Sequence, residues 1–220
     1  MFTGIIEATG KIAQKLPTGG DCRLLIRSDS LDFSDVKLGD SIATNGVCLT
    51  VTGFETNAYW ADVSNETLRL STLEGLALGA EVNLEKAMLA TSRFGGHIVS
   101  GHVDCIGRVE SLSDDGRSIR IEIGVPNHLK RYIAHKGSIT VDGISLTVNE
   151  LTQHGFLLNI VPHTAKETTM KHYQVGTLVN LEVDVIARYL EQLLHSGDTA
   201  KAASKIDQAF LAENGFYKSF

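Results

Sequence analysis

The chain has 220 residues, of which 43% are hydrophobic and 21% charged, so it can bury one large core or two small ones. Its net charge of −6 argues against a nucleic-acid or anionic-membrane surface, and no apolar run approaches the roughly 20 residues that span a bilayer. The 3 cysteines show no C-x-x-C spacing, which disfavours a disulfide framework or a zinc site. The first residues lack the basic start of a secretory signal, so we expect a cytoplasmic protein.

The first half of the chain has the pattern of β structure. Short runs of Val, Ile, Leu and Thr are separated by Gly, Asn and Asp at intervals of about ten residues. This spacing predicts a helical turn at 67–72 and strands at 5–13, 22–28, 41–44, 47–55, 58–63 and 81–85.

One hairpin sequence occurs twice. Residues 41–51, SIATNGVCLTV, return as residues 138–148, SITVDGISLTV. Asn-Gly and Asp-Gly at the two tips are the strongest short-range hairpin signals, because both tolerate positive φ. The offset of 97 residues (145 − 48) holds without gaps from Gly4 and Gly101 to Glu85 and Glu182. Such a fixed offset indicates a tandem duplication.

The second half repeats the strand pattern. A helical turn is predicted at 126–133, and strands at 102–111, 118–125, 138–141, 144–151, 155–161 and 178–183. Six short antiparallel strands hide their edges best by closing into a small barrel. We therefore expect an all-β fold of two tandem six-stranded antiparallel barrels, at residues 1–96 and 97–185.

The remaining segment, 186–220, changes character. The sequence predicts an amphipathic helix, a break at 195–198 and a weaker helix at 199–214. The first helix must bury its apolar face, either on its own domain or against copies of itself in an oligomer. That face consists of Ile186, Tyr189, Leu190, Leu193 and Leu194, at positions i, i+3, i+4, i+7 and i+8.

The repeated strands carry paired hydroxyl and thiol groups. Alternation places positions 48 and 50, like 145 and 147, on one face of their strand. If these groups face the mouth of a barrel, they suit a polar heterocycle with amide edges. The alternative is that threonine simply favours strands. Gly4 and Gly101 let the backbone approach something flat or bulky, or they only form the turn before a strand.

Cys48 of the first copy is replaced by Ser145 in the second, and three further positions also differ in chemistry between the two copies. His102, Lys136 and Asp184 stand where the first copy has Ile, Gly and Ala. Duplicated sites that diverge suggest one type of ligand bound twice, in two roles. A histidine can move protons near neutral pH, whereas Asp184 either has an altered acidity or caps the following helix. The other histidines lack metal-ligand spacing, and there is no P-loop, G-x-G-x-x-G or G-x-S-x-G motif.

Taken together, these motifs resemble the riboflavin synthase family of the α-chain type. The resemblance covers about residues 1–195. The stretches that carry it are 1–6, 45–51, 66–68, 96–103, 136–137, 142–148 and 179–184.

The resemblance implies both a fold and a reaction. The fold is two six-stranded Greek-key barrels of the split-barrel type, at 1–96 and 97–185, with a C-terminal α-helix in 186–220 that holds a homotrimer together. In the reaction, two molecules of 6,7-dimethyl-8-ribityllumazine dismutate by transfer of a four-carbon unit, giving riboflavin and 5-amino-6-(D-ribitylamino)uracil. Neither a cofactor nor a metal takes part. Each barrel binds one lumazine, and the working site lies between the N-barrel of one subunit and the C-barrel of its neighbour. An association with lumazine synthase stays open.

The resemblance also implies substrate contacts. Lys136 matches a residue that reaches a neighbour's ligand, and Phe2 positions the N-terminal arm. Asp142 orients or polarises the bound substrate. The N-barrel contacts are Gly4, Ile5, Ile6, Cys48, Leu49, Thr50, Asp62, Val63, Ser64, Asn65, Glu66 and Thr67. The C-barrel contacts are Gly101, His102, Val103, Ser145, Leu146, Thr147, Asn159, Ile160, Val161, Pro162, His163 and Thr164.

A smaller set is expected to take part in catalysis. His102 is the candidate for proton transfer, with Ser41 and Cys48 assisting at the partner ring. Asp184 would orient or polarise, and Ser145 is the counterpart of Cys48 in the second copy.

Two other functions compete with the enzyme. Lumazine proteins share this fold and bind the same ligand as a fluorescent antenna without catalysis; they depart at the site positions of one or both barrels and lack the trimer helix. A flavin-binding domain of a reductase would need a nicotinamide-nucleotide domain, which this chain lacks. The presence of Cys48, His102, Lys136, Ser145 and Asp184, together with the helix, favours the enzyme.

Overall fold

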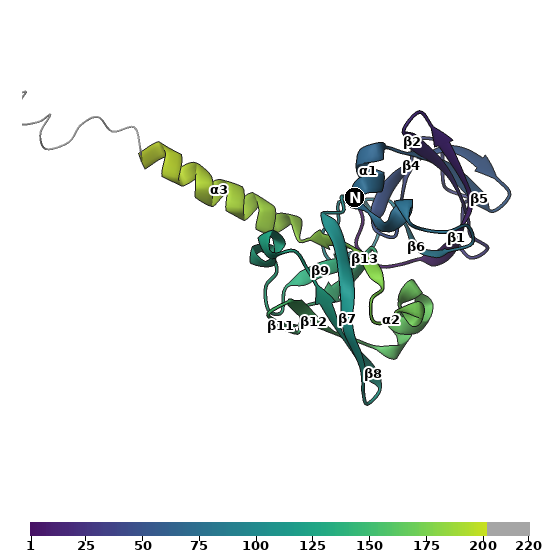
Figure 1. Cartoon of the computed structure of the whole chain (residues 1–220). Helices are drawn as coiled ribbons and strands as arrows, with labels where there is room; N and C mark the ends of the chain where they lie inside the picture. The colour runs from purple at the N-terminus through teal and green to yellow at the C-terminus, as the bar shows by residue number, and fades with distance from the viewer. Residues whose placement is uncertain (202–220) are drawn as a thin grey trace, which may run out of the picture. The chain divides into compact units, whose positions relative to one another are not determined.

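A computed structural model describes residues 1–201 of the chain. Its first half forms a closed barrel in the strand order β1-β2-β5-β4-β3-β6, with antiparallel neighbours throughout. The non-consecutive neighbours are those of a Greek key, as expected, and Figure 1 shows these strands in purple and blue. The strands are β1 (Ala8–Thr18), β2 (Asp21–Arg27), β3 (Ser41–Thr44), β4 (Val47–Glu55), β5 (Ala58–Val63) and β6 (Glu81–Lys86).

The second half repeats this order with one interruption. Its sheet runs β10-β9-β13-β7-β8-β12-β11, so the ring is open between β10 and β11, which together correspond to β4. The continuous strand predicted at 144–151 was therefore wrong. The strands are β7 (Cys105–Asp115), β8 (Ser118–Gly124), β9 (Ser138–Val141), β10 (Ile144–Thr147), β11 (Glu150–Leu151), β12 (Gly155–Ile160) and β13 (Leu178–Val183).

The interruption has a local cause. Between β10 and β11, the side chain of Asn149 accepts a hydrogen bond from the backbone N–H of Asn159 at 2.9 Å. A side-chain oxygen thus takes a donor that a ladder carbonyl would otherwise accept. At the equivalent place in the first half, β4 only has a bulge between Val51 and Gly53. The two halves therefore depart from a regular ladder at equivalent positions, and only in the second is the strand divided.

The two repeated hairpins pack tip to tip. Asn45 and Asp142 both have φ of 46°, and Gly46 and Gly143 follow with φ of 79° and 81°, which confirms the predicted turns. A Cβ on Gly46 would lie 2.7 Å from the backbone N of Gly143, and a Cβ on Gly143 would lie 2.7 Å from that of Gly46. Only glycine allows this approach of the two halves.

A buried polar layer joins the halves at these tips. The Asn83 side chain donates to the Asp142 carbonyl at 3.0 Å, and the equivalent Asn180 side chain donates to the Asn45 carbonyl at 2.8 Å. All four residues are at most 4% exposed. Separate apolar cores lie on either side, around Tyr59 in the first half and Phe156 in the second. Residues Met1–Val185 accordingly form one compact unit.

Short helices follow β5 in the first half and β12 in the second. The first, α1 (Asn65–Leu70), was predicted; Ser64 caps it by accepting a hydrogen bond from the Thr67 N–H at 3.2 Å. Its counterpart α2 (Pro162–Glu167) was missed, because Val161 precedes it in place of a capping side chain. The 3₁₀ turns are η1 (Thr72–Glu74), η2 (Asn127–Tyr132) and η3 (Thr169–His172).

The last described element is α3 (Val185–Lys201). The break predicted at 195–198 was wrong, because one glycine in a helix costs only about 1 kcal/mol. The helix predicted at 199–214 lies largely outside the described residues. No helix within residues 1–201 has the length and hydropathy needed to cross a membrane.

Candidate functional site

The loop before each half's first strand crosses to the other half. The Gly4 carbonyl accepts the backbone N–H of Ser145 at 2.8 Å, and the Gly101 carbonyl accepts that of Cys48 at 2.9 Å. Both glycines have positive φ, +77° and +82°. A Cβ on either would lie 2.6 Å from the Cβ of its partner, so glycine is needed at both crossings.

The crossing corrects the predicted grouping of the site residues. Residues 4–6 were assigned to the N-barrel and 101–103 to the C-barrel. In the structure, Ile6 packs against the core of the second half and Val103 against that of the first. The sequence misled because β1 and β7 begin three residues later than predicted, which leaves these segments as loops.

A first groove, of about 200 Å³, lies on the first half and is completed by the second. Thr67 stands at its edge and donates or accepts a 3.0 Å hydrogen bond with Ser64. His102 is exposed and Cys48 is half-buried, so both side chains are open to a ligand. The lining residues are Val47, Cys48, Glu66, Thr67, Leu70, Ser71, Gly101, His102 and Val103.

A second groove, of about 290 Å³, lies on the second half. Several of its residues are the repeat equivalents of predicted first-half contacts. It brings hydroxyl and amide groups together on one wall, which suits the carbonyl and N–H edges of a heterocycle. The lining residues are Ser145, Leu146, Thr147, Asn149, Asn159, Ile160, Val161 and Thr164.

Both grooves lie on the outside of the barrel wall. Leu49 and Val51 point into the first core, so Cys48 and Thr50 point outward. In the second half, Val148 is buried whereas Thr147 is exposed. The predicted alternation is confirmed, and apolar side chains fill the interior of both halves, so the polar groups face outward.

One histidine in the site was missed. The Nδ1 atom of His97 lies 2.7 Å from the Ser145 hydroxyl, next to the second groove. Burial lowers the pKa of His97, and the nearby Asp184 carboxylate partly offsets this. A neutral imidazole can accept the hydroxyl proton, so the pair can move a proton at this groove. The repeat gave no signal, since position 97 has no counterpart in the first copy.

Other predicted residues have structural contacts. Phe2 is buried in a cluster with Ala43 and Val99, so it anchors the N-terminal arm through packing. Asp142 lies in the polar layer between the halves, where the Tyr173 hydroxyl donates to it. Lys136 is exposed at a turn with φ of 63°.

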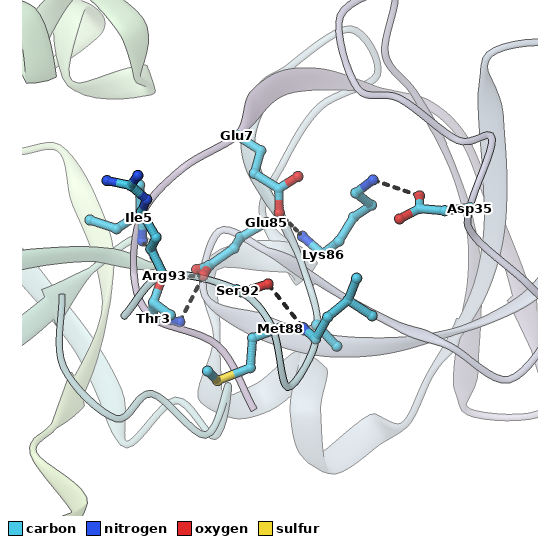
Figure 2. A pocket seen from close by; sticks show the side chains of 11 residues that line it. Thr3, Ile5, Glu7, Asp35, Glu85, Lys86, Met88, Ser92 and Arg93 are labelled. Atoms are coloured by element: carbon cyan, nitrogen blue, oxygen red, sulfur yellow. Dashed lines mark hydrogen bonds and ion pairs between the residues drawn. The ribbon is translucent and has the colours of Figure 1, made fainter. Parts of the chain in front are cut away.

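The remaining predicted residues lie in the first core, in polar contacts, at the start of α2 or in neighbouring pockets. Leu49 and Val63 belong to the first core, Asp62 pairs with Arg23 at 3.6 Å, and the Asn65 N–H donates to Asp21. Pro162 and His163 begin α2. Ser41 lines a separate pocket of about 180 Å³ with Asp40 and Met88, and Ile5 lines the pocket shown in Figure 2.

The pocket in Figure 2 shows how the N-terminal loop is held. In this cavity of about 310 Å³, the Glu85 carboxylate points at Thr3 and accepts its backbone N–H and its hydroxyl, each at 2.7 Å. Glu182 makes the same contacts with Ser100 in the second half, at 2.7 and 2.6 Å. Sequence reasoning gave neither glutamate a role, although the repeat places a carboxylate at both positions.

The chain matches known proteins over nearly its full length. The lumazine binding domain family matches it twice, at residues 3–87 and 100–184. Proteins named riboflavin synthase are similar to it: that of Photobacterium phosphoreum is 52% identical over 98% of this chain and 99% of its own. The one from Bacillus subtilis (strain 168) is 43% identical over 98% of this chain and 100% of its own.

Solved structures share the fold. Crystal structures of LumP in complex with 6,7-dimethyl-8-(1'-D-ribityl) lumazine and with riboflavin superpose with TM-scores of 0.75 and 0.77. Each covers 83% of this chain and 99% of LumP, at 22% identity, so this likeness concerns the fold alone. The two domain matches and the full-length relatives show more: the chain belongs to the riboflavin synthase family of lumazine-binding proteins.

Proposed function

We propose that this chain catalyses the riboflavin synthase reaction. Two molecules of 6,7-dimethyl-8-ribityllumazine dismutate by transfer of a four-carbon unit, and riboflavin and 5-amino-6-(D-ribitylamino)uracil result. The observation that carries the proposal is a pair of grooves built from equivalent strands but with unlike side chains, Cys48 and His102 in one, Ser145 with His97 in the other. A donor and an acceptor of the same compound need such a pair. Full-length relatives with the name riboflavin synthase support it.

The substrate supplies much of the chemistry. A lumazine ring is its own electrophile, and its 7-methyl group is acidic because the negative charge delocalises into the ring. The protein must hold two rings face to face in opposite orientations. Proximity and orientation can supply up to roughly 7–11 kcal/mol of a bimolecular barrier. Proton transfer by groove residues and exclusion of water would add to this.

Roles follow from the placement of the side chains. In the first groove, His102 exchanges the proton of the carbon acid, and the Cys48 thiol assists. In the second groove, Ser145 acts with His97, which stands within hydrogen-bond distance of its hydroxyl. Asp184 acts through His97, since its charge opposes the effect of burial on the pKa of that histidine.

The assembly is part of the same proposal. The chain forms a homotrimer through α3, whose apolar residues recur on one face, and the working site combines the first groove of one subunit with the second groove of its neighbour. We place the domains at 1–96, 97–185 and 186–220, and the matches at 3–87 and 100–184 support the first two. We also place the protein in the cytoplasm.

A single incubation tests the reaction. The protein is mixed with 6,7-dimethyl-8-ribityllumazine alone, and the products are separated by chromatography. We expect riboflavin and the ribitylaminouracil in equal amounts, with two lumazines consumed for each riboflavin. Heat-denatured protein is the control. A change in lumazine emission with no riboflavin formed would contradict the proposal and favour an antenna protein.

A further inference from the structure

Two buried glutamates hold the two crossing loops. Glu85 on β6 and Glu182 on β13 are equivalent in the repeat, and each is 4% exposed. Each carboxylate accepts three hydrogen bonds from one loop. Besides the two contacts with Thr3 or Ser100, the second oxygen of Glu85 accepts the Gly4 N–H at 2.9 Å, and that of Glu182 accepts the Gly101 N–H at 3.0 Å.

Each loop held in this way is hydrogen-bonded to residues of one groove. The loop held by Glu182 accepts the Cys48 N–H through the Gly101 carbonyl, and its next residue is His102. The loop held by Glu85 accepts the Ser145 N–H through Gly4. The Thr3 carbonyl of that loop also accepts the backbone N–H of His97, at 3.1 Å.

We propose that Glu85 and Glu182 are positioning residues, each assigned to one groove. Glu182 fixes His102 against Cys48 in the first groove, and Glu85 fixes His97 and Ser145 at the second. This inference rests on the proposed function in one respect only, namely that the grooves bind lumazine rings.

The chemistry of the contact requires a carboxylate. An ionised carboxylate offers only acceptors, so it can satisfy three donors at once. A glutamine keeps the shape but turns an amide N–H₂ group toward a donor, which breaks at least one bond of the set. An aspartate keeps the charge but is one methylene shorter, so it restores the bonds only in part.

The pKa shifts of the two glutamates have different electrostatic causes. Burial raises the pKa of Glu182, and the hydrogen bonds from Ser100 and Gly101 and the charge of His102 oppose that rise. Burial likewise raises the pKa of Glu85, against the hydrogen bonds from Thr3 and Gly4. The charge of His102 thus lowers the pKa of Glu182, whereas the charge that acts on Glu85 is that of Glu7, which raises its pKa.

The test measures each groove separately in the full-length protein. The probe is 6-methyl-7-oxo-8-ribityllumazine, in which an oxo group replaces the acidic 7-methyl group, so no reaction occurs. Calorimetry gives the number of sites and their affinities. Protection of Cys48 from alkylation by iodoacetamide, followed by mass spectrometry, identifies the first groove, since Cys48 lines it. Riboflavin formation is measured in parallel.

We expect Glu182→Gln to weaken one site at least about tenfold and to shift the protection of Cys48 to a correspondingly higher probe concentration, because hydrogen bonds to charged groups are the strong ones. Glu85→Gln should weaken the other site and leave the protection intact. Each Asp variant should recover part of the loss. Glu74→Gln, at an exposed glutamate of η1, is the matched control and should change neither site.

A purely structural role gives a different result. If either Gln variant weakened both sites equally, or neither, the inference would be overturned. Should Glu182→Gln fail to fold, Ser100→Ala removes one of its three bonds and should show the same selectivity with a smaller effect. The proposed function fails separately, if the unmodified protein binds the probe in both grooves but forms no riboflavin.

Discussion

Replacing Gly101 by alanine should damage the first groove more than it damages the fold. A residue with φ of +82° costs about 1–2 kcal/mol when it carries a Cβ. That Cβ would lie 2.6 Å from the Cys48 Cβ and 2.9 Å from the Phe2 ring. The loop must then move and lose the hydrogen bond between the Gly101 carbonyl and the Cys48 N–H, a further roughly 0.5–1.5 kcal/mol. Together these terms lower the free energy of unfolding by about 1.5–3.5 kcal/mol.

Gly116 provides the matched control. It also has positive φ, +69°, but no heavy atom lies within 4 Å of the position of its Cβ. Gly116→Ala should therefore lose only the backbone term, about 1–2 kcal/mol, and keep its activity. Urea denaturation measures the free energy of unfolding, and the 7-oxo probe with Cys48 protection measures the first groove. Equal losses of stability and unchanged protection of Cys48 in both variants would refute the crossing of the loop as described.

Three further changes test other parts of the account. Burial raises the pKa of Asp142 to about 6, so the folded state holds the carboxyl proton more tightly than the unfolded chain does. The stability that this group contributes is therefore present below about pH 4 and is lost as the pH rises through 6. Asp142→Asn, which copies Asn45 of the first half, should remove that dependence in urea titrations between pH 4 and 7; an unchanged pH profile would contradict it. His102→Gln should lower turnover far more than it lowers affinity for the 7-oxo probe, and equal losses would remove His102 from the proposed catalytic residues. A chain ending after Asp184 should sediment as smaller species with little activity, and a fully active monomer would argue against a site shared between subunits.

Local signals predicted the hairpins well. The bounds of β3, β4, β5 and β9 agree with the predicted ranges 41–44, 47–55, 58–63 and 138–141. Alternating apolar residues and an Asn-Gly or Asp-Gly turn act over a few residues, so the sequence carries the whole signal. The fixed offset of 97 residues then predicted the corresponding strands of the second half. Applied to α1, it would also have found α2, since Asn65 and Leu70 correspond to Pro162 and Glu167.

Local sequence signals could not predict the contacts between residues far apart in the chain. Nothing near Gly4 in the sequence indicates that its carbonyl meets Ser145, because that pairing depends on how the two barrels join. The same holds for Asp142, which the sequence placed near the ligand and the structure places between the halves. His97 was missed for a related reason: its partner hydroxyl lies 48 positions away, across the crossing loops.

The most direct measurement is a crystal structure of the full chain with 6-methyl-7-oxo-8-ribityllumazine. We expect one ring in each groove, the first against Cys48, Thr67 and His102, and the second against Ser145 and Thr164. A groove closed by its own side chains, or a ring bound only in the pocket of Figure 2, would contradict it.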